Sequence, residues 1–190
     1  MRIIAIDPGY ERLGIAVLER QPPKAAPFGK GDSRRREVLL FSSCVRTPKE
    51  LPHAERLLRI ATEVRKVIDE FEPEGCAIET LFLGVNQKTV MPVAEARGAV
   101  LVEAARANLA VYEYTPLQIK IAVTGYGRSE KTQVTEMVKK LILVPEKTSL
   151  LPKKAVLPLL RENKSTRLDD EYDAIAVGLT CLASERQKKG

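Results

Sequence analysis

The chain has 190 residues, of which 44% are hydrophobic and 29% are charged. This length suits one sizeable domain, and the composition is that of a soluble globular protein, not a disordered one. No stretch approaches the roughly 20 apolar residues of a membrane span, and an acid interrupts the N-terminal apolar run too early for a secretory signal. Three widely spaced cysteines argue against a disulfide framework or a cysteine-rich zinc site and predict a reducing, cytoplasmic location: Cys44, Cys76 and Cys181.

The net charge of +6 is unevenly distributed along the chain. Residues 115–167 hold eleven Lys and Arg against four Glu, a local charge of +7, so the remainder sums to −1. A basic half beside a nearly neutral half indicates a surface for a polyanion, with nucleic acid the leading candidate. A merely solvated surface would give the same count, so charge alone leaves both interpretations open.

Short apolar runs predict three strands in the first quarter of the chain. The first covers 2–6, the second covers 13–18 after a short turn, and the third covers 37–45. Between the last two lies a proline-rich and glycine-rich basic stretch, 21–36, that we expect to be an exposed loop.

The middle of the chain changes to helical periodicity. Apolar residues recur at spacings of three and four over 52–71, which predicts a helix, and a brief buried strand follows over 76–78. A second helix, rich in small residues, is expected over 90–108. A strand over 111–114 and a helix beginning at Pro116 come next.

The last third of the chain predicts two more helices. Ser129 is expected to cap a helix over 131–143, while prolines and lysines weaken the pattern over 144–168. Asp169 is the expected N-cap of a final helix with inward-facing Ala174, Ile175, Val177 and Cys181 or Leu182. The element order predicts one α/β domain over residues 1–190, with a mixed five-stranded sheet and helices on both faces.

Four acids stand where hydrophobic elements begin or end. Asp7 closes the first strand, Glu79 closes the fourth, and Asp170 and Asp173 share one face of the last helix. Such carboxylates would repel one another unless a cation neutralised them, and Mg²⁺ prefers oxygen ligands. Taken singly, Asp7 could be a turn residue and the helical acids could favour the helix dipole. Together with a basic half, they indicate two-metal phosphodiester hydrolysis.

Five sequence blocks in a fixed order carry a more specific signal. They are Ile6-Asp7-Pro8-Gly9; Ala77-Ile78-Glu79 before Phe82; Glu95-Ala96-Arg97-Gly98; the stretch from Gln118-Ile119-Lys120 through Gly125-Tyr126-Gly127 to Glu130-Lys131; and Asp170-Glu171-Tyr172-Asp173-Ala174. Nearly the whole chain thereby resembles the RuvC family of Holliday-junction resolvases.

The resemblance implies a ribonuclease H-like fold, a homodimer, and symmetrical nicking of four-way DNA junctions in recombination and repair. It also implies two Mg²⁺ per active site, with Mn²⁺ as a substitute, and a branch-migration motor as a further partner. The metal-binding catalytic acids would be Asp7, Glu79, Asp170 and Asp173. DNA would be contacted by Phe82, Lys120, Arg128 and Lys131, and the helix over 90–108 would lie near the dimer interface.

Two departures and two alternatives accompany this resemblance. The segments 21–36 and 144–168 are longer than the family pattern leads us to expect, so they are interpreted as insertions that leave the four acids untouched. Asp7-Pro-Gly followed by Arg12-Leu13-Gly14-Ile15-Ala16 also resembles YqgF-like nucleases that act on structured RNA. A catalytically silent junction-binding protein is the other alternative. The single histidine, His53, lies among surface residues before a helix and is a poor candidate for catalysis.

Overall fold

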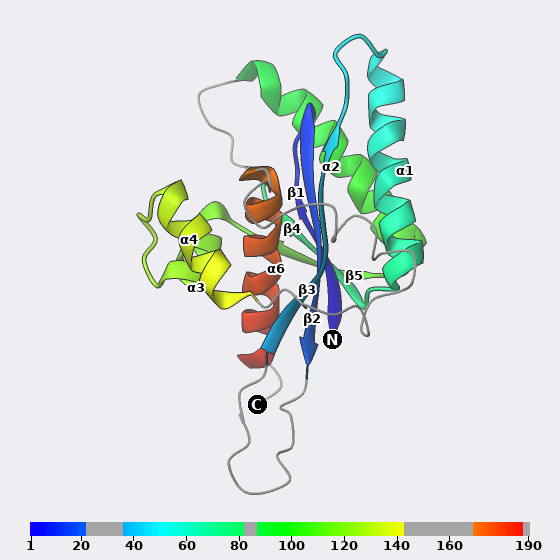
Figure 1. Ribbon diagram of the computed structural model, residues 1–190. Coiled ribbons are helices and arrows are strands. Elements are labelled where there is room, and N and C mark those ends of the chain that lie inside the picture. Colours follow the sequence, from blue (N-terminus) through cyan, green and yellow to red (C-terminus); the bar gives the residue numbers. More distant parts are fainter. Residues whose placement is uncertain (22–35, 82–86, 143–168, 188–190) are drawn as a thin grey trace, which may run out of the picture.

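The structure is a computed structural model that describes residues 1–21, 36–81, 87–142 and 169–187. A central sheet lies between two layers of helices (Figure 1). The strands are β1 (Arg2–Asp7), β2 (Arg12–Gln21), β3 (Arg36–Arg46), β4 (Gly75–Glu79) and β5 (Ala110–Tyr114). The helices are α1 (His53–Phe71), α2 (Gln87–Arg106), α3 (Pro116–Thr124), α4 (Lys131–Leu141) and α6 (Asp169–Gln187).

The sheet has the mixed pairing that the sequence predicts. Its strand order is β3-β2-β1-β4-β5, in which β1, β2 and β3 pair antiparallel while β4 and β5 join parallel. Ile6 of β1 pairs with Ile78 of β4, so Asp7 and Glu79 end neighbouring parallel strands at the same edge of the sheet. The predicted convergence of these two acids therefore follows from strand register.

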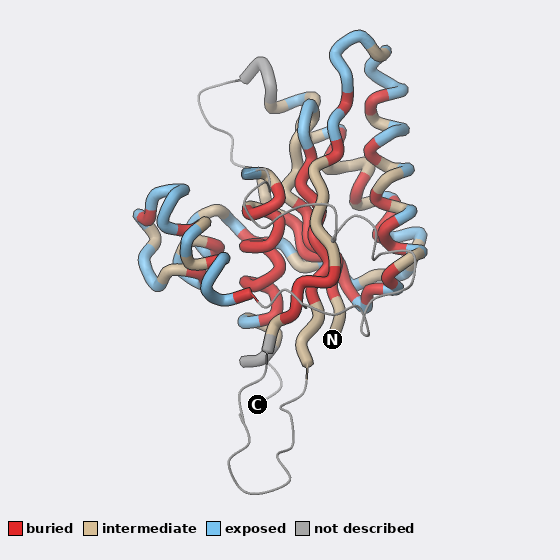
Figure 2. The backbone as a smooth tube through the Cα atoms, viewed as in Figure 1, coloured by how far each residue is buried: buried red, intermediate tan, exposed pale blue. Residues whose placement is uncertain are grey.

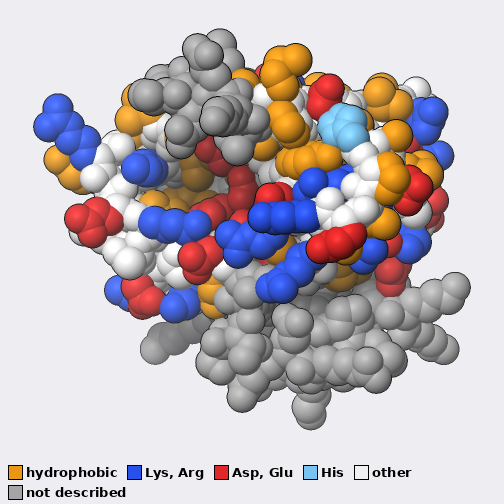
Figure 3. Space-filling model, turned by 90° about the horizontal axis from the view of Figure 1, so that it is seen from above, with side chains coloured by type: hydrophobic (Ala, Val, Ile, Leu, Met, Phe, Trp, Pro, Cys, Tyr) orange, Lys and Arg blue, Asp and Glu red, His pale blue; other side chains and the backbone are white. Residues whose placement is uncertain are grey.

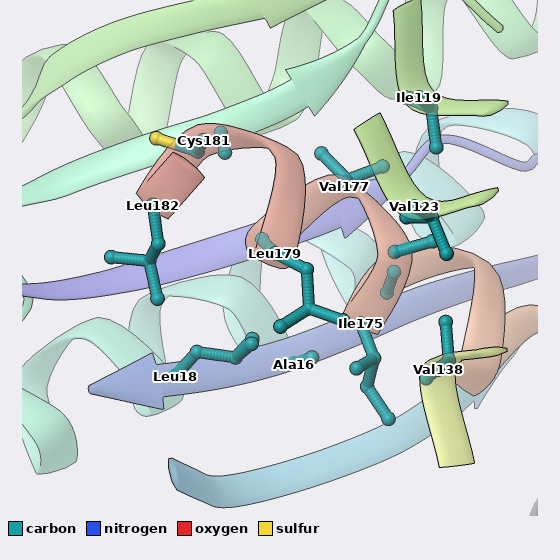
Figure 4. Close-up of a cluster of buried hydrophobic side chains, with 14 of the residues drawn as sticks. Ala16, Leu18, Ile119, Val123, Val138, Ile175, Val177, Leu179, Cys181 and Leu182 are labelled. Atoms are coloured by element: carbon teal, nitrogen blue, oxygen red, sulfur yellow. The ribbon is translucent and has the colours of Figure 1, made fainter. Parts of the chain in front are cut away.

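Both faces of the sheet are covered by helices, as Figure 2 shows by the red core between paler outer surfaces. Successive strand residues point to opposite faces, so Ile3 and Ala5 pack with α3, α4 and α6 while Ile4 and Ile6 pack with α1 and α2. The α6 side supplies the cluster of Figure 4, which includes the inward-facing residues predicted for the last helix: Ile175, Val177, Cys181 and Leu182.

Helix starts differ from the prediction at three places. Helix α2 begins at Gln87, three residues earlier than expected, and ends at Arg106. The N-cap of α4 is Glu130, which forms a capping box with Gln133. Ser129 is buried instead, because its hydroxyl donates to the Tyr126 carbonyl (2.7 Å) and so closes the preceding loop. Asp169 lies within the first turn of α6 and is not its cap.

Some predictions fall outside the described residues. Residues 22–35 of the expected loop 21–36, all of 144–168, and Phe82 belong to this group. The expectation of one domain over residues 1–190 stays a prediction. In the described part of the chain the three cysteines are free, and no helix is both long and apolar enough to cross a bilayer.

Helix α6 lies directly against the sheet because small residues face it. A Cβ on Gly178 of α6 would reach within 2.5 Å of the Leu18 side chain. A Cβ on Gly14 of β2 would overlap the backbone carbonyl of Asp170, at the first turn of α6. Glycine at position 14 thus lets the helix that carries two of the predicted catalytic acids approach the strand that pairs with Asp7.

We expect Gly14→Ala to destabilise the fold by about 2 kcal/mol, because overpacking against a backbone atom cannot be relieved by a side-chain rotation. Urea denaturation in EDTA measures the change. Gly98→Ala is the matched control, since nothing lies within 4 Å of a Cβ there and a helix favours alanine over glycine by about 1 kcal/mol. Equal stabilities for Gly14→Ala and wild type would refute the close contact.

Candidate active site

The four predicted acids gather at the end of the molecule where β1 and β4 stop. Asp7 and Glu79 come from these strand ends, and the first turn of α6 adds Asp170 and Asp173 at a helical spacing of three. Viewed from above, acidic side chains lie in a hollow that Lys and Arg side chains flank (Figure 3). The charges of Glu79, Asp173 and Asp170 all act on Asp7, so the four carboxyl groups are neighbours in the fold.

A fifth acid, Glu171, fixes the start of α6. Its side chain is buried and accepts a hydrogen bond from the Ser42 hydroxyl of β3 at 2.7 Å. Together with the contact between Gly14 and the Asp170 carbonyl, this bond ties the first turn of α6 to two neighbouring strands. The role of Glu171 was not predicted, because the sequence gives no sign that Ser42 lies beside it.

Basic residues hold the helical acids from two sides. Arg12 Nε lies 3.4 Å from Asp170 Oδ2, and the Cys44 thiol donates to the same oxygen at 3.6 Å. On the other side, Lys131 Nζ lies 2.8 Å from Asp173 Oδ2 and 3.7 Å from Asp169 Oδ2. Arg12 is a further functional candidate that sequence reasoning missed, although it lies only three residues after the Asp-Pro-Gly turn.

The strand-end acids are energetically costly in their charged forms. Burial, and then repulsion from Glu79, Asp173 and Asp170, raises the pKa of Asp7 to about 8, against the attraction of Lys131. Burial and the charge of Asp173 raise the pKa of Glu79 to about 7. Burial also raises the pKa of Asp173, which the hydrogen bond from Lys131 partly offsets. The cluster therefore holds more negative charge than its neighbours neutralise.

This donor set fits a hard divalent cation. Carboxylate oxygens are the ligands that such ions prefer, and an ion would relieve the repulsion that raises the pKa values of Asp7 and Glu79. Among the described residues, no three Asp, Glu, His or Cys side chains already form a metal-binding group. The Asp173 carboxylate is instead paired with Lys131, at 2.8 Å.

A cleft opens beside these acids between α3, α4 and α6. It has a volume of about 220 Å³ and is lined by two acids, two lysines and apolar residues: Glu79, Asp173, Lys120, Lys131, Pro116, Ile119, Val134 and Ala176. Two ammonium groups next to two carboxylates suit a phosphate that approaches a cation-binding centre. The predicted roles of Lys120 and Lys131 are consistent with this position.

The other predicted DNA-binding residues are placed differently. Arg128 is exposed in the loop between α3 and α4 and does not line the cleft, so its role stays a prediction. Phe82 lies outside the described residues. His53, which sequence reasoning set aside as a surface residue, has a partner at each ring nitrogen: Nδ1 is hydrogen-bonded to the Tyr10 hydroxyl, and Nε2 lies 2.9 Å from Oε2 of Glu95.

Comparisons with known proteins identify the family of this chain. Residues 3–181 match the family model described as crossover junction endodeoxyribonuclease RuvC. A protein of that description from Thermosipho melanesiensis is 39% identical over 97% of this chain and 98% of its own length. One from Thermotoga petrophila is 38% identical over 100% of this chain and 96% of its own length.

Solved structures extend the agreement to three dimensions. Thermus thermophilus RuvC superposes with a TM-score of 0.76 at 31% identity, covering 99% of this chain and 97% of its own. The same protein in complex with a Holliday junction substrate gives a TM-score of 0.76 at 30% identity, covering 99% and 96%. The yeast mitochondrial resolvase Ydc2 shares the fold, with a TM-score of 0.63 at 13% identity, covering 98% and 80%. The expected ribonuclease H-like fold is confirmed, and the chain belongs to the RuvC family of crossover junction endodeoxyribonucleases.

Proposed function

We propose that this chain resolves four-way DNA junctions by paired symmetrical nicks, in recombination and repair. The observation that carries the proposal is the cluster of acids at the ends of β1, β4 and the start of α6, next to a cleft with two lysines. The Thermus thermophilus relative solved with a Holliday junction substrate supports the choice of DNA. Membership of the RuvC family favours this substrate over the structured RNA of YqgF-like nucleases.

Nucleases of this family depend on divalent metal ions, and we propose two Mg²⁺ per active site, for which Mn²⁺ could substitute. Asp7, Glu79, Asp170 and Asp173 would hold the ions through their carboxylate oxygens. When bound, such ions supply a water nucleophile at neutral pH and stabilise the leaving oxygen. A catalytically silent junction-binding protein would have no use for these acids beside a phosphate.

The protein's own residues prepare the site for a phosphate. Lys120 and Lys131 present ammonium groups in the cleft, where they would attract the DNA backbone before the chemical step. Lys131 also holds the Asp173 carboxylate at 2.8 Å. Arg12 restrains Asp170 from the opposite side at 3.4 Å. In the absence of metal ions, these two ion pairs partly neutralise Asp170 and Asp173.

We propose a homodimer, because paired nicks at a two-fold junction require two sites related by symmetry. Helix α2 is the candidate interface, since its outer face carries two exposed apolar side chains, Met91 (68% exposed) and Val102 (49% exposed). A branch-migration motor as a further partner and a cytoplasmic location stay predictions.

The first test separates nicking from binding. Asp7→Asn should abolish nicking of a labelled mobile four-way junction in Mg²⁺, because it removes a charged metal ligand. Its affinity for the same junction in EDTA at pH 9, measured by gel shift, should equal that of wild type or exceed it a fewfold, because a charge that repels phosphate is gone.

Glu136→Gln is the control for the same loss of charge outside the cluster. Glu136 is an exposed acid of α4 that pairs with Lys139 at 2.8 Å, and its removal should leave nicking intact. Near-normal nicking by Asp7→Asn would overturn the metal-site proposal. Cleavage of a structured RNA but not of the junction by the wild-type protein would favour the YqgF-like alternative.

The raised pKa of Asp7 predicts a pH-dependent stability. The pKa rises from 3.8 to about 8 on folding, so between these values the folded state binds a proton that the unfolded chain has released. Stability therefore falls as pH rises from about 4 to 8 and remains reduced above that. In EDTA, Asp7→Asn should raise Tm by roughly 4–8 °C at pH 9, for a relief of about 2 kcal/mol, and by much less at pH 4.

Differential scanning calorimetry at the two pH values measures this effect. Added Mg²⁺ should raise the Tm of the wild-type protein at pH 9, because an ion supplies the missing positive charge. The gain should be smaller in Asp7→Asn. A Tm difference between the two proteins that is the same at pH 4 and pH 9 would show that Asp7 is not charged against its neighbours.

The dimer has a separate test. Light scattering at micromolar concentration should give twice the mass of the chain, and Val102→Asp should give the single mass because it buries a charge in an apolar contact. The variant should then make single nicks instead of paired ones on a four-way junction. A wild-type monomer, both free and bound to junction DNA, would refute the dimer.

A further inference from the structure

The turn between β1 and β2, residues 8–11, is held by a network outside the acidic cluster. Thr47, just after β3, is buried and donates its backbone N–H to the Glu11 carbonyl at 3.0 Å. Its hydroxyl donates to the Tyr10 carbonyl. Arg56 of α1, also buried, donates through Nε to the Thr47 hydroxyl at 3.1 Å. Two successive carbonyls of this turn are therefore fixed from one residue.

The side chain of Tyr10 is held on its face and at its hydroxyl. The Arg56 guanidinium carbon lies 3.7 Å from the centre of the Tyr10 ring, a cation–π contact. The Tyr10 hydroxyl lies 2.6 Å from Nδ1 of His53, the first residue of α1. On the other side of that ring, His53 Nε2 lies 2.9 Å from Oε2 of Glu95 in α2. The chain of contacts thus joins the turn to two helices.

These contacts assign the proton on the neutral histidine. A carboxylate such as Glu95 only accepts hydrogen bonds, so its position 2.9 Å from Nε2 of His53 favours the tautomer with hydrogen on Nε2. Nδ1 is then the unprotonated nitrogen, and it accepts the hydrogen bond from the Tyr10 hydroxyl. The three side chains are thereby linked through the two ring nitrogens of His53. Such outer partners commonly orient the groups that bind a metal or substrate.

The position of Tyr10 in the sequence gives this network a function. Asp7, the last residue of β1, lies three residues before it, and Arg12, which pairs with Asp170, lies two residues after it. We propose that Tyr10, His53 and Glu95 form a positioning relay that sets the turn between β1 and β2, and with it Asp7 and Arg12, for the nicking reaction. The relay rests on the proposed nuclease function and goes beyond the four acids.

The relay is distinct from a catalytic triad. His53 and Glu95 are each about half exposed, and none of the three relay residues lines the cleft beside the acids. The histidine, pale blue in Figure 3, lies on the same face of the molecule as the acidic hollow but to one side of it. These residues act through the turn and are positioning residues.

Tyr10→Phe removes one hydroxyl and leaves the ring on Arg56. We expect the single-turnover nicking rate at saturating Mg²⁺ and junction to fall about tenfold, as for other outer partners of a metal site. The junction Kd in EDTA should stay within about twofold, since no DNA contact is lost. Glu95→Ala should lower the rate similarly, whereas Glu95→Gln should restore most of it because its amide oxygen still accepts from His53. Combining Tyr10→Phe with Glu95→Ala should cost no more than either change alone.

Glu63→Ala is the matched control, on α1, the helix that begins at His53. It breaks an exposed ion pair of α1, Lys66 Nζ to Glu63 Oε1 at 2.6 Å, that has no contact with the turn, so the nicking rate should not change. Unchanged nicking in Tyr10→Phe would overturn the relay. So would a rate loss in Glu95→Gln as large as in Glu95→Ala, or a loss that matches the fraction unfolded in a thermal melt.

A second measurement needs no activity. The chain has one histidine, so ¹⁵N spectra of histidine-labelled protein in EDTA at pH 8.5 report on His53 alone. We expect the tautomer with hydrogen on Nε2, and a shift of the Nδ1 signal in Tyr10→Phe as its donor is lost. The other tautomer, or an unmoved Nδ1 signal, would overturn the relay. If the wild-type protein failed to nick junctions, the proposed function would fail, while these spectra would still decide whether the relay exists.

Discussion

Asp7 ends the central strand of the sheet with a carboxylate that is largely shielded from water and surrounded by other acids. Burial and the charges of Glu79, Asp173 and Asp170 raise its pKa to about 8, against the attraction of Lys131. A fold gains nothing from such a group in isolation, because an uncompensated buried charge is destabilising. The surrounding elements can be understood by how they bring these acids together and keep them in place without a neutralising ion.

Strand pairing brings the first two acids together. The parallel register of β1 and β4 places Asp7 and Glu79 at one edge, and β2 pairs Gly14 with Asp7 so that a residue without a side chain faces the start of α6. Helix α6 can then approach closely enough for Asp170 and Asp173 to join the cluster. Ser42 and Glu171 fix this approach by a hydrogen bond at 2.7 Å. A glycine, a serine and a buried glutamate thus determine where two catalytic candidates lie.

Much of this arrangement could be predicted from the sequence, because it depends on local patterns. Apolar runs that end on Asp7 and Glu79, and acids three residues apart at a helix start, have a direct structural meaning. The hydrogen bond from Ser42 to Glu171 could not be predicted, since the two residues are 129 positions apart. The contacts of His53 could not be predicted for the same reason, because its partners come from a turn and from another helix. Serine is a typical N-cap residue, but the hydroxyl of Ser129 donates to the Tyr126 carbonyl within the loop and does not cap the helix.

The turn between β1 and β2 contacts both the acidic cluster and the network around His53. Arg12, at its end, reaches the acidic cluster through Asp170, while Tyr10 faces away toward Arg56 and His53. A carboxylate cluster that would hold ions for a reaction needs a rigid backbone, because displacement of a reacting group by about 1 Å can reduce a rate a hundredfold. Thr47 supplies that rigidity by fixing the carbonyls of Tyr10 and Glu11. The side chains of Asp170 and Asp173 are held by ion pairs with Arg12 and Lys131, which can exchange for others. Rigid backbone and exchangeable charges are therefore supplied by different residues, so the turn can stay fixed while the carboxylates change partners.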